Sequence, residues 1–310
     1  MRVLLAGRGD VSVVHVAAIS ALGAELVGVC DSTSDYRAML SALRPDVVHV
    51  CTPHDTHVPI ALEALAHGAH VLLEKPVAHT IEEAAVLVDA LADFPDLQVG
   101  VCLQNRYNAT SRAASQFLQD QDHASVRGGS ATVLWHRDAA YYAKRPWRGE
   151  RERSGGGVLI NQAIHTIDLL QWLLGEVSQV SGHSARMSDI PGIDVEDTAN
   201  LLLDHVGGAR SVVFATVTNA VDSPVTIEIA TSSAVLHLRG DLTITHDDGR
   251  VEVVAEPRST GEGRDYWGAS HQLLIADFYR AISSGEPFGI TPADALKSQK
   301  IIDEIYRKGT

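Results

Sequence analysis

Short apolar runs separated by amphipathic segments fill the first hundred residues. Continuous apolar runs are typical of strands buried on both faces, and apolar residues every three or four positions are typical of helices packed against a sheet. The runs are Val3–Ala6, Ala24–Cys30, Asp46–Cys51, Ala69–Leu73 and Leu97–Leu103, and the helical segments are Val13–Leu22, Asp35–Leu43, Pro59–His67 and Thr80–Leu91. This alternation with short connections predicts an α/β domain with a doubly wound parallel sheet.

A second pattern begins near Asp122, where apolar and polar residues alternate one by one. Such alternation is typical of antiparallel strands that are covered on one face. The expected strands are Val126–His136, Val177–Met187, Ala199–Asp204, Arg210–Val217, Val225–Ala230, Val235–Arg239, Leu242–His246 and Val251–Ala255, and two helices follow over Ala269–Ser283 and Pro292–Arg307. We therefore expect two domains, residues 1–121 and 122–310. The second is an α+β domain with a large, mostly antiparallel open sheet, and its last helix packs back on the first domain.

Three glycines, Gly155 to Gly157, precede a strongly apolar segment, which predicts a helix that begins near Val158. Asn161, His165 and Asp168 lie at positions i, i+4 and i+7, so in an α-helix they fall within about 60° of one another. A polar stripe on an apolar helix must find partners. It is either a satisfied polar seam between two layers or the wall of a functional site.

The first strand runs into Gly7-Arg8-Gly9, and a helix follows. Strand, glycine turn and helix form the Rossmann-like geometry in which backbone N–H groups meet a pyrophosphate, although Ser12 replaces the third glycine of the GxGxxG pattern. Asp31 ends the second strand, where a carboxylate accepts both ribose hydroxyls and repels a 2′-phosphate, so NAD is favoured over NADP. Two alternatives stay open: Asp31 caps the next helix, or Arg37 reaches a phosphate.

Parallel sheets bind ligands beyond the carboxyl ends of their strands. Five chemically interesting residues follow strand ends here: Gly7, Asp31, Thr52, Lys75 and Asn105. Their shared position predicts one ligand-binding rim.

The composition of the chain limits which binding partners are expected. The net charge of −14 argues against nucleic acid and anionic membranes, and no apolar run approaches the ~20 residues of a membrane span, so we expect a cytoplasmic protein. Cys30, Cys51 and Cys102 lie in strand-like runs and are interpreted as buried thiols. His54-x-x-His57 allows a metal site, but the neighbouring histidines are split among different elements, and we predict no metal.

Several motifs together resemble one family. Thr52-Pro53…His57, Glu74-Lys75-Pro76, Asn105-Arg106-Tyr107-Asn108 and Gly155-Gly156-Gly157…Asn161…His165…Asp168, after an N-terminal GxG, resemble the glucose–fructose oxidoreductase/inositol dehydrogenase (Gfo/Idh/MocA) family over nearly the whole chain. The resemblance implies NAD(P)-dependent oxidation or reduction of a hydroxyl-bearing carbon on sugars, cyclitols and related molecules. It makes Lys75 the lysine beside the nicotinamide and His165 the acid/base. Asn161 and Asp168 become substrate ligands. The expected cofactor ligands are Gly7, Arg8, Gly9, Asp31, Thr52, Pro53, His57, Glu74, Lys75 and Asn105.

Two features depart from that family. Many members have Asp at the position of Asn161, and an amide positions a hydroxyl but cannot take its proton. The Asp31–Pro45 connection is short where the family often has an extra helix and strand, which leaves the adenosine end of the cofactor more exposed.

The chemistry also follows from the residues alone. A hydride leaves a carbinol carbon as its hydroxyl proton is removed, which suits the His165 imidazole, and the Lys75 ammonium stabilises the alkoxide. Asp168 either orients that ring or serves capping or interdomain pairing. Three functions remain. The first is an NAD-dependent sugar or cyclitol dehydrogenase; the resemblance to the family adds an enzyme that uses NAD transiently to eliminate a glycosidic group, and a non-catalytic NAD sensor. A loop from Tyr141 to Arg148 is either a substrate lid or an oligomer contact. The family resemblance implies a homodimer or homotetramer through the second sheet.

Overall fold

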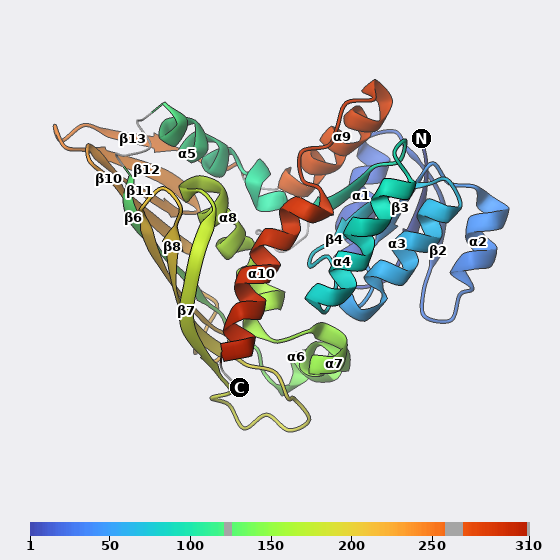
Figure 1. Ribbon diagram of the computed structural model, residues 1–310, viewed down its shortest axis with the longest axis horizontal. Coiled ribbons are helices and arrows are strands. Elements are labelled where there is room, and N and C mark those ends of the chain that lie inside the picture. Colours follow the sequence, from blue (N-terminus) through green and yellow to red (C-terminus); the bar gives the residue numbers. More distant parts are fainter. Residues whose placement is uncertain (121–125, 258–268, 309–310) are drawn as a thin grey trace. The chain divides into compact units, whose positions relative to one another are not determined.

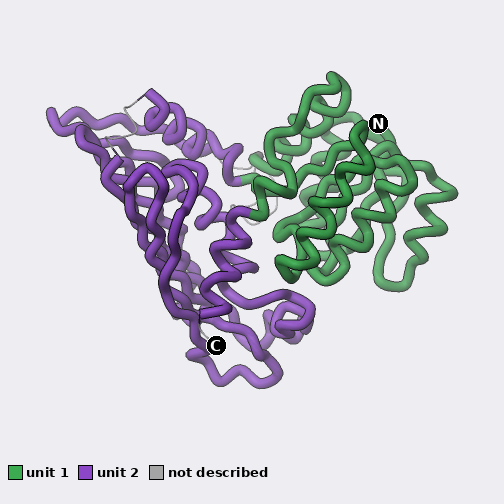
Figure 2. The backbone as a smooth tube through the Cα atoms, viewed as in Figure 1, with its two compact units in different colours: residues 1–104, 258–296 green, residues 105–257, 297–310 purple. Residues whose placement is uncertain are grey.

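The computed structural model describes residues 1–120, 126–257 and 269–308, which group into two compact units. Unit 1 comprises residues 1–104 and 258–296, and unit 2 comprises residues 105–257 and 297–310 (Figure 2). The expected boundary at residues 121/122 lies outside the described residues. The grouping differs from a simple split of the chain, because a late helix packs with the first sheet and most of the last helix packs with the second.

Unit 1 is a five-stranded, fully parallel sheet with helices, as the apolar runs predict (Figure 1). Its strand order is β2-β1-β3-β4-β5, so the order of the strands reverses between β1 and β3. The strands are β1 (Arg2–Ala6), β2 (Glu25–Cys30), β3 (Val47–Val50), β4 (His70–Glu74) and β5 (Val99–Cys102), and the helices are α1 (Ser12–Ala21), α2 (Tyr36–Leu43), α3 (His57–Ala66), α4 (Ile81–Ala90) and α9 (Ala269–Ser284). The carboxyl ends of parallel strands share one edge, which gathers the predicted rim residues of this unit.

Helix α9 belongs to unit 1 although it follows the second sheet in sequence. A Cβ at Gly100 of β5 would lie 2.8 Å from the Phe288 ring and 2.9 Å from the Phe278 ring, so glycine makes room for both rings. The Val101 N–H also donates to the Ile290 carbonyl at 2.9 Å. The segment from α9 to Ile290 therefore completes the core of the first sheet.

Unit 2 contains an eight-stranded sheet in the order β13-β12-β11-β10-β6-β9-β8-β7, in which only the β6–β9 pair is parallel. All eight expected strands are present, with ends shifted by one or two residues. They are β6 (Val126–Leu134), β7 (Val177–Ala185), β8 (Thr198–His205), β9 (Arg210–Thr216), β10 (Thr226–Thr231), β11 (Ala234–Arg239), β12 (Asp241–His246) and β13 (Val251–Val254). The helices are α5 (Ala109–Gln119), α6 (Ala139–Lys144), α7 (Arg151–Ser154), α8 (Ile164–Leu174) and α10 (Pro292–Lys308), the last belonging to unit 2 from Lys297.

The two faces of this sheet differ. The inner face forms a core with α8 and with the Ile301, Ile302 and Ile305 side chains of α10. The outer face carries apolar residues that stay exposed, including Leu202 and Val212, which pair across β8 and β9, and Phe214. Within the described part of the chain, no helix combines the length and apolar character that a membrane span requires.

Candidate functional site

The glycine turn after β1 has the backbone geometry that a dinucleotide requires. Gly7 has φ +106°, and a Cβ there would lie 2.3 Å from the Cys51 carbonyl oxygen, so only glycine fits this left-handed position. Ser12 occupies the third glycine position, and its Oγ donates to the Gly9 carbonyl at 2.7 Å. The N-cap residue of α1, Val11, has no polar side chain to cap the helix. The first N–H groups of the helix therefore suit a pyrophosphate.

Asp31 follows β2 and lies in a loop that holds its carboxylate. Asp31 Oδ1 accepts from the Thr33 Oγ1 at 2.7 Å, the Thr33 N–H at 3.0 Å and the Ser34 Oγ at 3.1 Å. Chiefly through the Thr33 hydroxyl, these bonds lower the pKa of Asp31 to about 2. Asp35, and not Asp31, caps α2 by accepting from the Arg37 and Ala38 N–H groups.

The charged neighbours of Asp31 also have defined partners. Arg8 Nη1 lies 3.7 Å from Asp31 Oδ2, so the turn residue and the strand-end carboxylate are neighbours. Arg37 instead lies 3.0 Å from Glu63 of α3. This ion pair directs the Arg37 guanidinium toward α3, which weakens the alternative that Arg37 binds a 2′-phosphate.

His57 joins the ends of β3 and β4. Its ring is fully buried between two backbone carbonyls, with Nδ1 2.8 Å from the Pro76 oxygen and Nε2 3.0 Å from the Thr52 oxygen. Burial lowers the pKa of His57, although both carbonyl contacts oppose the shift. The imidazole thus ties the Thr52 turn to the segment that contains half-buried Lys75, whose peptide bond to Pro76 is cis.

The carboxylate of Glu74 is buried inside unit 1. Glu74 Oε1 lies 3.0 Å from His15 Nε2 and 3.5 Å from His271 Nε2, and only 6% of the residue is exposed. Burial alone would raise the pKa of Glu74, but hydrogen bonds from the two imidazoles outweigh that effect and lower it. Its predicted role in cofactor binding stays a prediction. The nearby Cys51 and Cys102 are buried free thiols, as expected, and burial raises the pKa of each.

In unit 2, the helix predicted from Val158 has two parts. Leu159–Ala163 forms a π-helical turn, and α8 begins at Ile164. Asn161 therefore lies in the wider turn, and the assumed spacing of 3.6 residues per turn does not hold across the whole stripe. Asn161 and His165 are both half-buried beside fully buried apolar neighbours. π-Helical turns occur frequently at functional sites.

Gln162 is half-buried as well, although no motif in the sequence marks it, and we call Asn161, Gln162 and His165 together the half-buried row. Its Nε2 donates to the Tyr141 hydroxyl of α6 at 3.1 Å. The aromatic ring of Tyr141 in turn faces Arg148 at 4.7 Å and Arg137 at 5.3 Å. The only sequence signal for Gln162 is its place beside Asn161, because α-helical spacing puts it on a different face.

The glycine turn before this row is fixed by Glu196. Its carboxylate accepts from the Gly157 N–H at 2.8 Å, the Leu159 N–H at 3.0 Å and the Tyr306 hydroxyl at 2.7 Å. A Cβ at Gly157 would lie 1.8 Å from the Glu196 carbonyl oxygen. The glycines therefore allow a close approach of two backbones, which sets where the π-helical turn begins.

Asp168 is the most buried member of the predicted stripe. Its carboxylate accepts from Arg106 Nε at 2.8 Å, Arg106 Nη2 at 2.6 Å and Ser298 Oγ at 3.0 Å, and 1% of the residue is exposed. This forked ion pair joins α8 to α10 and to the segment that contains Asn105. Neither Arg106 nor Ser298 was assigned a role from the sequence. These contacts support a structural pairing role for Asp168. Its predicted role in substrate binding stays a prediction.

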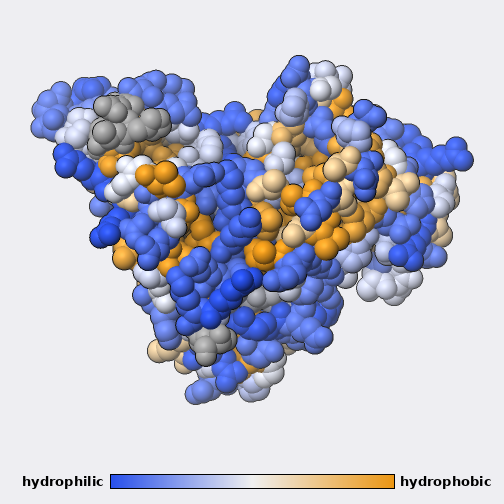
Figure 3. Space-filling view, in the orientation of Figure 1, coloured by the Kyte–Doolittle hydropathy of each residue, from blue (hydrophilic) through white to orange (hydrophobic). Residues whose placement is uncertain are grey.

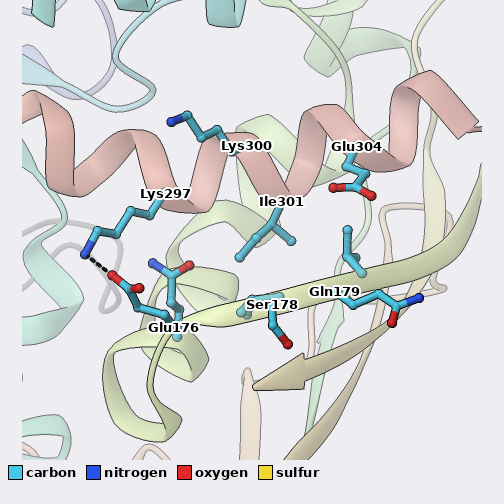
Figure 4. A pocket seen from close by; sticks show the side chains of 10 residues that line it. Glu176, Ser178, Gln179, Lys297, Lys300, Ile301 and Glu304 are labelled. Carbon is cyan, nitrogen blue, oxygen red and sulfur yellow. Dashed lines mark hydrogen bonds and ion pairs between the residues drawn. The ribbon is translucent and has the colours of Figure 1, made fainter. Parts of the chain in front are cut away.

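Unit 2 also has a surface pocket. It is lined by β7 and α10, with Lys297 and Glu176 paired at 2.7 Å at one end and Glu304 at the other (Figure 4). The surface over the C-terminal part of α10 is hydrophilic (Figure 3). None of the predicted site residues lines this pocket.

The parallel sheet with a glycine turn after its first strand is the fold of an NAD-binding Rossmann domain, and the family match shows the class of protein, an NAD-binding oxidoreductase. The chain belongs to the Gfo/Idh/MocA family. Residues 1–101 match its NAD-binding Rossmann-fold oxidoreductase domain, and residues 111–237 match the GFO/IDH/MocA C-terminal domain.

Named relatives act on sugars. Levoglucosan dehydrogenase of Pseudarthrobacter phenanthrenivorans is 27% identical over 64% of this chain and 56% of its own length. D-Glucoside 3-dehydrogenase of Escherichia coli is 33% identical over 52% of this chain and 50% of its own length. The chain thus aligns with about half the length of these two relatives. The WlbA dehydrogenase of Bordetella pertussis, solved with NADH and UDP-GlcNAcA, has a TM-score of 0.81 and 26% identity, covering 99% of this chain and 96% of that one.

Proposed function

We propose that this protein is an NAD-dependent dehydrogenase that acts on a hydroxyl-bearing carbon of a sugar, a cyclitol or a sugar derivative. The observation that carries the proposal is the half-buried row of Asn161, Gln162 and His165 on an otherwise buried helical segment. Two amides and an imidazole in such a row are suited to bind hydroxyl groups and to move one proton. The names of the relatives support the substrate class.

The proposed reaction divides its work among three residues. Bound NAD supplies the acceptor for the hydride that leaves the carbinol carbon. His165 takes the hydroxyl proton, and the Lys75 ammonium stabilises the negative charge that develops on that oxygen. Asn161 donates or accepts a hydrogen bond that holds the hydroxyl in place but takes no proton.

Neighbouring side chains support a carbohydrate substrate. Tyr141 presents a ring next to Gln162, and aromatic faces pack on the C–H faces of sugars. Arg148 lies against that ring, where a guanidinium also suits a carboxylate or phosphate on the sugar. We therefore extend the expected substrates to sugar acids and nucleotide sugars.

A substrate screen tests this function. The protein is mixed with NAD and a panel of polyols, aldoses, sugar acids and nucleotide sugars, and NADH absorbance is followed. We expect net NADH formation with at least one member of the panel and none with His165→Ala. Glycoside cleavage that needs NAD but accumulates no NADH would instead indicate transient oxidation. NAD binding without turnover of any compound would favour a sensor.

We also propose that the outer face of the second sheet binds a second copy of this chain. Leu202, Val212 and Phe214 are 36%, 48% and 44% exposed on neighbouring strands. Val235 of β11 and Val253 of β13 extend the exposed apolar residues along the sheet. A self-complementary apolar face of this kind suits an isologous dimer.

A further inference from the structure

A cluster of two histidines and a glutamate lies inside unit 1, and none of the three residues moves the proton or stabilises the alkoxide in the proposed reaction. His15 comes from α1, Glu74 from the end of β4, and His271 from the first turn of α9. All three residues are buried, with exposures of 0%, 6% and 1%. They are far apart in sequence, so the sequence pattern alone gives no sign that they meet.

The donor atoms of the cluster are close enough to share one ion. Glu74 Oε1 is 3.0 Å from His15 Nε2 and 3.5 Å from His271 Nε2, and the three donors lie within 4.8 Å of one another. Zinc bonds to nitrogen and carboxylate oxygen of about 2.0–2.1 Å in a tetrahedral site place neighbouring donors roughly 3.3–3.4 Å apart. Both measured separations are within a few tenths of an ångström of that spacing.

The chemistry of the donors favours one type of metal. Two imidazole nitrogens and one carboxylate oxygen are a ligand set for zinc and related divalent transition metals. Magnesium and calcium prefer shells made of oxygen, so this set disfavours them.

A second layer of hydrogen bonds supports the required form of His15. The Nδ1 atom of His15 is 2.9 Å from His49 Nδ1, and His49 Nε2 is 3.0 Å from the Tyr279 hydroxyl. When His15 Nε2 binds a metal, its Nδ1–H donates to His49, and the His49 Nε2–H donates to Tyr279. Metal-binding histidines commonly have such a partner, which fixes the ring and its tautomer.

We propose that unit 1 binds one zinc ion, or a similar divalent transition metal, through His15 Nε2, Glu74 Oε1 and His271 Nε2. The ion joins α1, β4 and α9 and so holds the late helix on the first sheet. A water molecule takes the fourth position. The site is structural, and it does not depend on the proposed dehydrogenase activity.

Metal binding and stability test this site without an activity assay. The full-length protein is stripped with a chelator, and zinc chloride is added while heat release and Tm are recorded. We expect one zinc per chain and a higher Tm, with no comparable effect of magnesium chloride. His271→Gln should weaken zinc binding by more than about 100-fold, the upper end of the cost for changes outside the ligand shell.

Control variants keep the test decisive. His246→Gln changes a half-buried histidine that lies beside Glu252 in unit 2, outside the unit that contains the cluster, and should leave zinc binding unchanged. Should His271→Gln fail to fold, cobalt added to the wild-type protein should give the visible absorption of a tetrahedral site, and His15→Gln should lack it. Zinc binding that is equal in the wild type and His271→Gln, or absent from the wild type, would mean that the cluster is a hydrogen-bonded network only.

Discussion

Asp31 keeps its charge because hydroxyl and amide groups of its own loop hold the carboxylate. With a pKa of about 2, lowered from an ordinary value near 3.8, it loses its charge only as pH falls through that low value. Its contribution to NAD binding should therefore be complete at any pH above about 4. We expect the Kd for NAD to change less than about twofold from pH 8 to pH 5, measured by fluorescence titration. A steady loss of affinity over that range would show that another group binds the ribose.

The same carboxylate should set the choice of cofactor. At pH 8 the 2′-phosphate of NADP is fully ionised and is repelled by Asp31. We expect NAD to bind more tightly than NADP, and Asp31→Ser to narrow the difference. Ser32→Ala, in the same loop, is a control that leaves the carboxylate in place. Equal binding of both cofactors to the wild type would contradict the proposal.

Lys75 is expected to act on the transition state more than on cofactor binding. If its ammonium stabilises the alkoxide, Lys75→Ala loses a charge interaction worth about 3 kcal/mol, or roughly two orders of magnitude in kcat. The Kd for NAD should change little. Lys300→Ala removes an exposed lysine of α10 and should leave both quantities unchanged. An effect of Lys75→Ala on NAD binding alone would make Lys75 a cofactor ligand.

The division of labour between Asn161 and His165 can be tested by pH profiles. His165→Ala should nearly abolish oxidation, whereas Asn161→Ala should weaken substrate binding by about 1–2 kcal/mol through a lost hydrogen bond. Asn161→Asp adds a carboxylate near His165, which favours the imidazolium form. The pH of half-maximal oxidation should then rise. An unchanged profile, together with near-normal activity of His165→Ala, would show that the proton leaves by another route.

At the scale of elements, Glu196 holds both the glycine turn and the π-helical turn in place through its hydrogen bonds to Gly157 and Leu159. A side chain at Gly157 would collide with the Glu196 backbone, and overpacking of this kind costs about 1–3 kcal/mol or more. Gly157→Ala should therefore lower the free energy of unfolding, measured in urea, and should reduce kcat by displacing Asn161 and His165. Gly207→Ala, which adds a methyl group in open space, should change neither. Full activity and stability of Gly157→Ala would refute this role of the turn.

Elements that follow from the residues of their own segment could be predicted from the sequence. Elements that depend on contacts with residues far away in the sequence could not. Strands β8, β9 and β11 of unit 2 alternate between buried and exposed residues because one face of the sheet is covered, and one-by-one alternation is visible in sequence. The π-helical turn depends on Glu196, which lies more than thirty residues after it in the sequence. Local spacing carries no sign of that partner, and it therefore predicted an ideal α-helix at Asn161. Asp168 shows the same limit, since its partners Arg106 and Ser298 come from other elements. A buried carboxylate requires partners, but the sequence does not say which ones.

At the scale of the whole molecule, the exposed apolar face of the second sheet leads us to predict that two copies of the chain form a dimer through it. Phe214→Lys places a charge on that face and should lower the mass measured by light scattering after gel filtration. Val86→Lys changes an exposed apolar residue of α4 in unit 1 and should leave the mass unchanged. A wild-type protein that is already monomeric, or a Phe214→Lys variant of unchanged mass, would contradict a dimer through this face.

The division into units was only partly readable from the sequence. The change from apolar runs to alternating strands correctly separates the two sheets. It does not show that α9 returns to the first sheet, because the signal for that return is the space left by Gly100 for Phe278 and Phe288. A glycine in an apolar strand has many explanations, and only the fold shows which ring fills the space.

The discontinuous first unit has a consequence for how the protein is made. Its five strands are synthesised by residue 104, but their last covering segment ends at residue 296, which is 192 residues later. At about 5–20 residues per second, the ribosome needs roughly 10–40 s to supply it. During that interval the nascent sheet lacks the Phe278 and Phe288 rings over β5, and the His49 and Glu74 side chains lack Tyr279 and His271. The nascent chain therefore exposes an incomplete apolar layer over β5 until late in translation.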